Sequence, residues 1–538
     1  MHGSGRRNKR TVTAISVVGV AALLAAGCGS GRTDDGGDAS SGDSIVVGTT
    51  DKIVTLDPAG AYDNGSFTPM NQVYPFLMNF APGDATPKPD AAEKCEFTQP
   101  VVYTCTLKDG LKFANGNPLT ANSVKFSYDR ILKINDPNGP ASLLTQLAKT
   151  DVVDDKTVAF TLKNANDQTF PQVLATNAGP IVDEKSFPAD KIMDDNDIVK
   201  AKPFAGPFTI ESYDKNRLVE YKANPDYKGI LGKAKTPQVS VKYYASADNL
   251  KLDTQNNSID VGFRSYSPTD IDSLRKDDKV TVHEGPGGEL RYIVFNLNTM
   301  PGGTPEQKLA VRKAIASSVD RDALSRDVYK GTYTPAYSSI PQGVPGAVES
   351  YKDIYGATPN KEAAAKFLAD AGIPTPVPVS LQYNPDHYGG SSSEEYAAIK
   401  SQLDGTGLFN VNLQSTEWVT YQKERTQDAY PLYQLGWFPD FPDADNYLTP
   451  FFAPNNFLQS HFENPVITDL LVKETTEPDR TKRDAILKET QDQLAQNFIP
   501  MLPLLAGKQI AVAAKNVQGV DDTLDASFKF RYTVLSKG

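Results

Sequence analysis

The stretch "YTCTLKDGLKFANGNPLTANSVKFSYDRIL" covers residues 103–132 and carries a strand pattern, a turn and a helix start in succession. The Asn-Gly pair at 115–116 favours a tight turn between extended segments. Thr120 and Asn122 belong to the residue types that cap the first turn of a helix, and we expect that helix to begin at Ser123. The stretch therefore predicts a strand that leads through a tight turn into a capped helix.

This stretch resembles the signature of the family 5 extracellular solute-binding proteins. The family has a Gly-hydrophobic-Lys-Phe strand that continues through Asn-Gly-x-Pro-Leu-Thr-Ala into a helix. The matching positions here are Lys108, Gly110, Phe113, Asn115, Gly116, Pro118, Leu119, Thr120 and Ala121. Where the family usually carries two acids, this chain has Asn122 and Ser123, and both can still cap a helix. The fold that the resemblance implies is therefore not affected.

Further stretches resemble the same family, in the family's order, over nearly everything from Ser44 onward. They are TLDPA (55–59), NPDYKG (224–229), NSIDVG (257–262), FNLN (295–298), VRKAIASSVDRDAL (311–324), LGWFPDFPDADNYL (435–448) and NFIPMLPL (497–504). The segment KPFAGPF (202–208) departs from the family's usual Pro-x-Gly-x-Gly-Pro-Tyr, which affects one local turn. The resemblance implies an α/β fold like that of the type II periplasmic binding proteins, with two lobes, a hinge and an added domain.

Strand and helix patterns alternate along the chain and agree with this class. TVAFTL (157–162) and VSVKYY (239–244) have strand patterns. Residues 308–331 and 361–372 have apolar positions at helical spacing, and each segment ends at a glycine. The alternation predicts an α/β architecture with several sheets.

The resemblance also implies where the domains lie. The first lobe would be discontinuous and consist of residues 44–74, 202–289 and 505–538. The added domain would be residues 75–201, and the second lobe would be residues 290–504. Two or three chain crossings between the lobes would then form a hinge that closes over a ligand.

The N-terminus has the pattern of a secretory signal peptide. Cationic residues come first, and an apolar run follows over residues 11–27. The run is at the short edge of what spans a bilayer and small residues close it, so a transmembrane helix is the weaker interpretation. We therefore expect residues 1–27 to be a signal peptide and the protein to be exported.

Cys28 follows Ala-Ala-Gly and resembles the lipobox cysteine of bacterial lipoproteins, which is lipidated and becomes the new N-terminus. Leu24 lies one position further from Cys28 than in the usual pattern. Residues 28–43 have almost no apolar side chains, so they cannot form a core and are expected to be a tether with a reach of roughly 20 Å. We expect a lipoprotein anchored to the outer face of the bacterial cell membrane.

Cys95 and Cys105 are the other two cysteines. Apolar residues alternate around positions 98–100, which suggests two short strands and a turn that could bring the cysteines opposite each other. An exported protein meets an oxidising environment, so we expect a disulfide between them. Metal binding is the weaker interpretation, because this spacing without a nearby histidine is not typical of zinc sites.

The net charge of the chain indicates which classes of partner to expect. The chain has 538 residues and a formal net charge of −11, which disfavours nucleic acid as a partner. The resemblance implies instead the membrane permease of an ATP-binding-cassette (ABC) importer, and we expect a monomeric receptor. The sequence has no Gly-x4-Gly-Lys-Ser/Thr loop of its own.

The stretch "GWFPDFPDADNYL" (436–448) places three aspartates among aromatic residues, with no cation in the run. In peptide-binding relatives, the aspartate after Gly-Trp-x-x pairs with the α-ammonium group of the ligand, and that position is Asp440 here. A carboxylate between aromatic side chains is poorly hydrated, so an ammonium partner satisfies it with charge-assisted hydrogen bonds. The resemblance therefore implies a receptor for di- to oligopeptides.

The same resemblance implies further ligand contacts. The main chain of Gly436 and Phe438 would pair with an extended peptide as an added strand, and Trp437 would line the pocket. The first lobe would contribute an opposing edge at Tyr62, Asp63 and Asn64. Because every peptide offers the same main-chain groups, such a receptor accepts many sequences.

Several of these residues also have interpretations that do not involve a ligand. Asp443 and Asp445 are expected to cap the helix that begins near Asn446. Asp440 could be a solvated loop acid, and Trp418 could line the cleft or fill a core. Two arginines are candidates for holding a peptide carboxylate, Arg264 and Arg291.

A secreted hydrolase with paired carboxylates is the rival class. The sequence has no Gly-x-Ser-x-Gly, no His-Glu-x-x-His and no Gly-x-Gly-x-x-Gly after a strand. The histidines beyond the signal peptide are scattered, at His283, His387 and His461. We therefore expect no catalysis, no metal and no cofactor.

Within the binding class, oligosaccharides are the first alternative to peptides. Sugar binding would favour aromatic platforms such as Trp418, Trp437 and Tyr447, and it would not need Asp440. Nickel or haem would need histidine or arginine along the cleft, which so few histidines do not favour.

Overall fold

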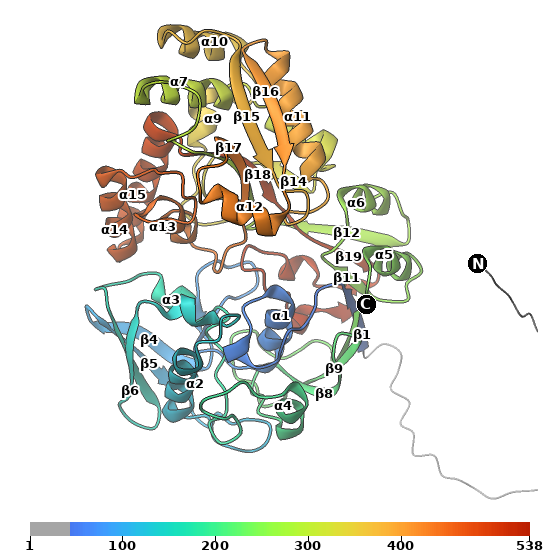
Figure 1. Cartoon of the computed structure of the whole chain (residues 1–538). Helices are drawn as coiled ribbons and strands as arrows, with labels where there is room; N and C mark the ends of the chain where they lie inside the picture. Colours follow the sequence, from blue (N-terminus) through green and yellow to red (C-terminus); the bar gives the residue numbers. More distant parts are fainter. Residues whose placement is uncertain (1–43) are drawn as a thin grey trace, which may run out of the picture. The chain divides into compact units, whose positions relative to one another are not determined.

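Two large sheets, one four-stranded sheet and two two-stranded sheets organise residues 44–538, the part of the chain that the computed structural model describes (Figure 1). The first sheet has seven strands in the order β12-β19-β11-β1-β10-β9-β8. These strands are β1 (Ser44–Thr49), β8 (Phe208–Asp214), β9 (Leu218–Ala223), β10 (Gln238–Tyr243), β11 (Val261–Phe263), β12 (Val280–Gly285) and β19 (Gln509–Ala514). Segments from the start, the middle and the end of the described chain therefore meet in one sheet.

The second sheet has six strands in the order β14-β18-β13-β17-β15-β16. These strands are β13 (Leu290–Phe295), β14 (Tyr333–Pro335), β15 (Val377–Tyr383), β16 (Phe409–Ser415), β17 (Leu432–Trp437) and β18 (Met501–Gly507). Alternate residues of β13 enter different apolar clusters, with Ile293 and Phe295 in one and Tyr292 and Val294 in the other. The sheet is therefore buried on both faces at β13, because side chains alternate along a strand.

The third sheet has four strands in the order β4-β5-β7-β6, with its own apolar cluster. These strands are β4 (Ala92–Gln99), β5 (Val102–Leu107), β6 (Leu147–Val152) and β7 (Thr157–Leu162). Cys95 and Cys105 lie directly opposite each other on β4 and β5, with Cα atoms 4.1 Å apart, and form a disulfide. The predicted disulfide is therefore confirmed, and so is the pair of strands that brings the cysteines together.

The turn and the helix predicted from residues 103–132 are both present. Gly116 has φ of +89° in the tight turn, a left-handed conformation that glycine adopts without strain. Thr120 caps helix α2 (Ala121–Ile134) by accepting the backbone N–H of Asn122, and Ser123 completes a capping box with Thr120. The helix begins at Ala121, two residues before the predicted start.

The long helical pattern over residues 308–331 forms two helices rather than one. Helix α7 (Pro305–Ala316) ends before Ser317, and Asp320 caps a new helix by accepting the backbone N–H of Ala323. The capping carboxylate stabilises a second start, so the prediction of one continuous helix is wrong. The other helices are α1 (Asn64–Val73), α3 (Phe170–Val173), α4 (Asp195–Ala201), α5 (Ala247–Gln255), α6 (Pro268–Leu274), α8 (Arg321–Ala323), α9 (Ser350–Tyr355), α10 (Lys361–Asp370), α11 (Ser392–Gly405), α12 (Trp418–Arg425), α13 (Thr449–Phe452), α14 (Pro465–Thr476) and α15 (Arg480–Gln493).

The chain passes between the two large sheets at two adjacent places. It leaves the first sheet after β12 and enters the second at β13, and it returns from β18 to β19. The backbone N–H of Gly507 donates to the carbonyl of Glu289 at 2.9 Å, which joins the two passages. A Cβ atom on Gly287 would lie 1.9 Å from the carbonyl oxygen of Gly507, so only glycine allows this approach.

A buried ion pair joins the TLDPA segment to helix α2. The guanidinium of Arg130 donates to both carboxylate oxygens of Asp57 at 2.7 and 2.6 Å, and the two side chains are 2 % and 0 % exposed. Asp57 also accepts the backbone N–H groups of Ala59 and Met193. The ion pair therefore joins the segment that follows β1 of the first sheet to helix α2, which packs beside the third sheet.

The N-terminal predictions lie outside the described residues. The signal peptide, Cys28 and the tether all fall within residues 1–43. Among residues 44–538, no helix combines the length and the hydropathy that a membrane span needs.

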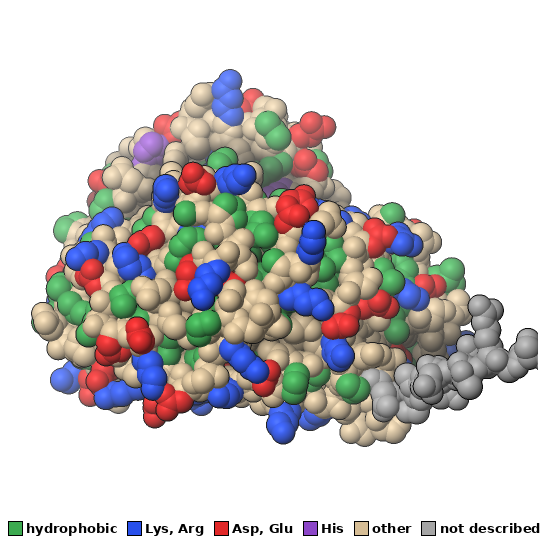
Figure 2. Space-filling view, turned by 90° about the horizontal axis from the view of Figure 1, so that it is seen from below, with side chains coloured by type: hydrophobic (Ala, Val, Ile, Leu, Met, Phe, Trp, Pro, Cys, Tyr) green, Lys and Arg blue, Asp and Glu red, His purple; other side chains and the backbone are tan. Residues whose placement is uncertain are grey.

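Figure 2 shows one face of the molecule, which has no large patch of only positive or only negative side chains. Basic and acidic side chains are mixed there rather than gathered by sign. A nucleic-acid-binding face would gather lysine and arginine on one side, and this face does not.

We predict that Arg130→Met destabilises the protein strongly. The substitution leaves the Asp57 carboxylate buried without its cation, and breaking a buried ion pair in this way costs about 3–5 kcal/mol. The free energy of unfolding in urea, followed by circular dichroism, measures the change.

Lys366→Met provides the control, because Lys366 and Asp370 form an exposed ion pair with side chains 74 % and 62 % exposed. The control should change the free energy of unfolding by no more than about 0.5 kcal/mol. Equal effects of the two substitutions would contradict the role given to the Asp57–Arg130 pair.

Candidate functional site

A cavity of about 580 Å³ lies between the two large sheets. The first sheet contributes Arg264, Ser265 and Tyr266 from the segment after β11, and the second sheet's region contributes Glu289 and Phe438. Aromatic side chains form much of the wall, namely Tyr266, Tyr329, Tyr333, Tyr388, Phe438 and Phe528. The cavity therefore combines aromatic side chains with five charged residues, Arg264, Glu289, Lys330, Glu394 and Lys508, and takes its walls from both sheets, which is typical of a small-molecule site.

The segment after β17 turns away from the second sheet and places Asp440 against Tyr62, which lies just before helix α1. The Tyr62 hydroxyl donates to Oδ1 of Asp440. Asn446 donates from its side-chain amide to Oδ2 of Asp440 at 3.2 Å, and its Oδ1 accepts the backbone N–H of Asp440 at 2.9 Å. The carboxylate is thus fixed by contacts from both sides of the junction.

Asp440 has only neutral partners within residues 44–538. No Lys, Arg or His of that range forms an ion pair with it. Burial raises the pKa of Asp440 above its ordinary value of 3.8, while the hydrogen bonds from Tyr62 and Asn446 oppose the rise. Burial and the adjacent Asp440 also raise the pKa of Tyr62, so its hydroxyl stays protonated and remains a donor. The carboxylate is poorly solvated and has no cationic partner there.

Of the residues around the Gly-Trp pair, Phe438 reaches the large cavity. Its side chain is 41 % exposed and lines the wall. Gly436 pairs with Arg291 on β13, and its carbonyl accepts hydrogen bonds from the hydroxyls of Tyr292 at 3.5 Å and Tyr388 at 3.3 Å.

Trp437 lies beside the large cavity rather than in its wall. Its Nε1 donates to Oδ1 of Asn446 at 3.2 Å, and its ring packs on Phe451 and Phe457. Trp437 therefore positions the same asparagine that holds Asp440.

The first-lobe residues predicted to form the opposing edge have different positions. Tyr62 contacts Asp440 as described. Asp63 caps helix α1 by accepting the backbone N–H of Ser66 at 2.8 Å, and Asn64 is exposed at the first residue of that helix.

The other two aspartates of the motif are structural. Asp443 caps the short helix Ala444–Tyr447 by accepting the backbone N–H of Asp445, so its capping role is confirmed. Asp443 also receives two hydrogen bonds from Arg483, at 2.6 and 2.8 Å. Asp445 does not cap a helix, because the helix starts before it, and its carboxylate instead accepts the hydroxyl of Thr449. Arg483 lies far along the sequence, and no local pattern pointed to it.

The structure separates the two arginines considered for a ligand carboxylate. Arg291 is 1 % exposed and donates to Glu395, to Ser392 and to the carbonyl of Tyr388. Arg264 lines the cavity, and its nearest acid is Asp51 at 3.6 Å. Arg264 is therefore the accessible one.

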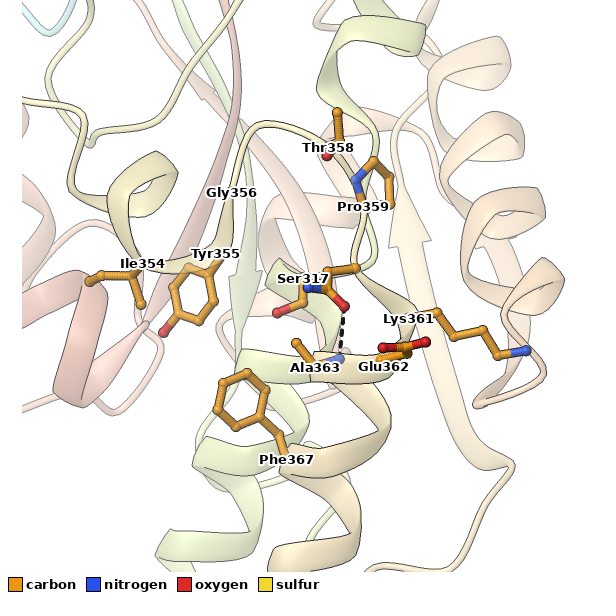
Figure 3. Close-up of a pocket in the computed structure, with 11 residues that line it drawn as sticks. Ser317, Ile354, Tyr355, Gly356, Thr358, Pro359, Lys361, Glu362, Ala363 and Phe367 are labelled. Carbon is orange, nitrogen blue, oxygen red and sulfur yellow. Dashed lines mark hydrogen bonds between the residues drawn. The ribbon is translucent and has the colours of Figure 1, made fainter.

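Two other cavities are separate from the large one, and Asp440 belongs to the lining of the first of them and not to that of the large cavity. One of about 420 Å³ extends from Asp440 toward Phe170 and Val173 near the third sheet. The other lies beside helix α10, where Ile354, Lys361 and Phe367 surround it (Figure 3). The second of these is lined only by residues between Ser317 and Phe367, so the first sheet contributes nothing to it.

The histidines occupy ordinary packing and hydrogen-bonding positions. His387 stacks on Trp418 with ring centroids 3.7 Å apart, which places Trp418 in a packed aromatic group. His283 pairs with Asp521, and His461 pairs with Asp428. Within residues 44–538, no group of three or more His, Cys, Asp or Glu side chains could hold a metal ion.

Comparison with known proteins identifies the class. Residues 86–459 match the model of the "Bacterial extracellular solute-binding proteins, family 5 Middle". The "Probable D,D-dipeptide-binding periplasmic protein DdpA" of Escherichia coli strain K12 is 28 % identical over 470 residues, which cover 84 % of this chain and 86 % of that protein. The "Heme-binding protein A" of Haemophilus influenzae is 25 % identical over 510 residues, covering 89 % and 90 % of the two chains.

Solved structures show the same fold. The unliganded open form of MppA, a periplasmic murein tripeptide binding protein, superposes with a TM-score of 0.79 at 19 % identity. The match covers 93 % of this chain and 98 % of that one. The predicted fold is confirmed as the two-lobe α/β fold of type II periplasmic binding proteins. Proteins of this family bind solutes for transport and are not enzymes, which confirms the prediction of a binding protein. This chain belongs to the bacterial extracellular solute-binding proteins of family 5.

Proposed function

We propose that this protein is the lipid-anchored receptor of an ABC importer and that it captures di- to oligopeptides outside the membrane for delivery to a permease. The observation that carries the proposal is Asp440, a poorly solvated carboxylate that has only neutral partners within residues 44–538 and lies where the lobes meet. The α-ammonium group of a peptide is the cation that such a carboxylate lacks, and it would form charge-assisted hydrogen bonds there.

The cavity between the large sheets would hold the rest of the peptide. Phe438, two residues before Asp440, lines this cavity and would connect the amine site to it. Arg264 would receive the ligand's carboxylate, because it is exposed to the same cavity and makes only a distant contact with Asp51. A peptide would therefore extend from the second lobe's acid toward the first lobe's arginine.

The proposed lobes follow the predicted boundaries. The first sheet takes strands from residues 44–74, 202–289 and 505–538, which supports one discontinuous first lobe. The two adjacent passages between the sheets would then act as the hinge.

An oligosaccharide receptor is the second candidate, and the aromatic lining of the cavity favours it. Tyrosine and phenylalanine side chains surround the cavity, and such platforms suit sugar rings. A sugar would not require the Asp440 carboxylate, so one substitution separates the two candidates.

We predict that Asp440→Asn weakens peptide binding by about tenfold or more at unchanged stability. The amide keeps the shape of the side chain but loses a charge-assisted hydrogen bond of about 1.5–3 kcal/mol, and about 1.4 kcal/mol corresponds to tenfold. Calorimetry with the peptide that co-purifies, identified by mass spectrometry, measures the loss.

The melting temperature of the variant provides its control. Unaltered peptide affinity would contradict the proposal that Asp440 binds the peptide's amine. Recovery of cleaved peptide would contradict the proposal that the protein is a receptor rather than a hydrolase.

We further predict that peptide affinity falls on mild acidification. Burial raises the pKa of Asp440 above 3.8, so the carboxylate is protonated at a higher pH than an exposed aspartate would be. A protonated carboxyl does not attract ammonium, so affinity is present above this raised pKa and is lost as the pH falls through it. Calorimetry at a series of pH values measures the decline, and Asp440→Asn should abolish it.

Anchoring has its own test. Cys28→Ser removes the only proposed site of lipidation, so the protein should move from the membrane pellet to the soluble and medium fractions. Immunoblots of the fractions measure the shift, with Cys95→Ser as the matched control that keeps the proposed anchor. If the Cys28 variant stays in the pellet, the anchor is elsewhere.

A further inference from the structure

Glu289 is an acid of the cavity that the sequence motifs did not indicate. It directly precedes β13, at one of the two passages between the lobes, and its side chain is 15 % exposed. The Tyr333 hydroxyl lies 2.8 Å from both of its carboxylate oxygens. The carboxylate is thus held in place at the cavity wall by a neutral donor.

Glu289 shares its nearest guanidinium with a second carboxylate. Arg291 donates to Glu395 at 3.0 Å, and Glu395 is completely buried and also accepts the Tyr329 hydroxyl. Glu289 lies further away, 3.5 Å from Arg291. One guanidinium therefore faces two carboxylates, and the carboxylate at the greater distance is the one that lines the cavity. Burial raises the pKa of Glu289, while the charge of Arg291 opposes the rise.

The opposite wall carries strain together with a positive charge. Arg264 and Ser265 both have positive φ, +62° and +73°, although neither is glycine. Successive left-handed residues cost free energy and are concentrated at binding sites, where the surrounding structure holds them. Arg264 also acts electrostatically on Glu289 across the cavity, without forming an ion pair within 4 Å. Arg264 and Glu289 therefore line the same cavity as opposite charges, and Lys330, Lys508 and Glu394 are the other charged residues of its lining.

We propose that Glu289 is a second cation-binding group of the receptor and that it selects peptides with a lysine-like side chain. The inference rests on the proposed function, since it assigns the amino terminus to Asp440 and the basic side chain to Glu289.

The position of the two acids fits one short ligand. Pro439, next to Asp440, packs on Gly288, next to Glu289, so closely that a Cβ on Gly288 would lie 2.6 Å from Cγ of Pro439. The two acids therefore flank a single contact, with Asp440 in the lining of the 420 Å³ cavity and Glu289 in that of the 580 Å³ cavity. Residues of an extended peptide span roughly 3.3–3.6 Å each, so one short ligand that passes this contact would reach both acids. A peptide of a few residues can bring its amine and a long side chain to these neighbouring positions.

The test compares Ala-Lys-Ala and Ala-Ala-Lys with the same tripeptides in which norleucine replaces lysine. Norleucine keeps the alkyl chain and removes the ammonium group. Calorimetry should find that at least one lysine peptide binds the unaltered protein about tenfold or more tightly than its norleucine partner, the ratio that about 1.4 kcal/mol produces. Glu289→Gln should remove this preference and leave the affinity for the norleucine peptide within about threefold, a difference below 1 kcal/mol.

Two variants control the result. Asp440→Asn should weaken the lysine and norleucine peptides alike, because it removes the amine contact that they share. Glu284→Gln should leave the preference unchanged, since Glu284 is an acid near the same passage that pairs with Arg275 and Lys508 and does not line the cavity.

The outcomes are distinct. Equal affinities for lysine and norleucine peptides at both positions, or a lysine preference that survives Glu289→Gln, would overturn the role of Glu289 while leaving a peptide receptor. Absence of binding for all four tripeptides and for the co-purified peptide would overturn the proposed function itself.

Discussion

The arrangement of the whole molecule depends on the close approach of two backbone segments between its large sheets. Gly287 and Gly507 pass each other without side chains, and the N–H of Gly507 bonds to the carbonyl of Glu289. The two passages between the sheets are therefore joined to each other by a backbone hydrogen bond. Glu289, whose carbonyl accepts this bond, lines the cavity, and its neighbour Gly288 packs against Pro439 in the segment after β17. The proposed hinge and the proposed ligand site therefore share one location.

Buried charge is treated in two different ways in this protein. The Asp57–Arg130 pair is fully matched and holds the chain together. Asp440 and Glu289 have neutral hydroxyl donors as their nearest partners, in Tyr62 and Tyr333. Matched pairs stabilise a fold, whereas a partly compensated carboxylate in a cavity is characteristic of a functional site.

Local sequence features predicted what depends on neighbouring residues. The Asn-Gly turn, the Thr120 cap and the disulfide between paired strands each follow from a few adjacent side chains. The α/β fold and the family followed from motifs in register. Tertiary contacts could not be predicted in the same way. The guanidinium of Arg483 reaches Asp443 from a separate helix. The incomplete pairing of Glu289 depends on Arg291 and on Glu395, which lies about a hundred residues further along the chain. Residues 308–331 form two helices although their apolar pattern is continuous, because the Asp320 side chain caps a second helix start.

The bond between Tyr62 and Asp440 has a consequence for the strength of capture. A guest that binds the carboxylate must compete with an internal hydroxyl, so its net gain is the difference between two hydrogen bonds rather than the whole of one. Charged donors form bonds roughly twice as strong as neutral ones, so an ammonium wins this exchange and an uncharged group gains almost nothing. In the proposed receptor, the Tyr62 hydroxyl would thus set the strength that a ligand's hydrogen bond to Asp440 must exceed, and it would bond the carboxylate again after release.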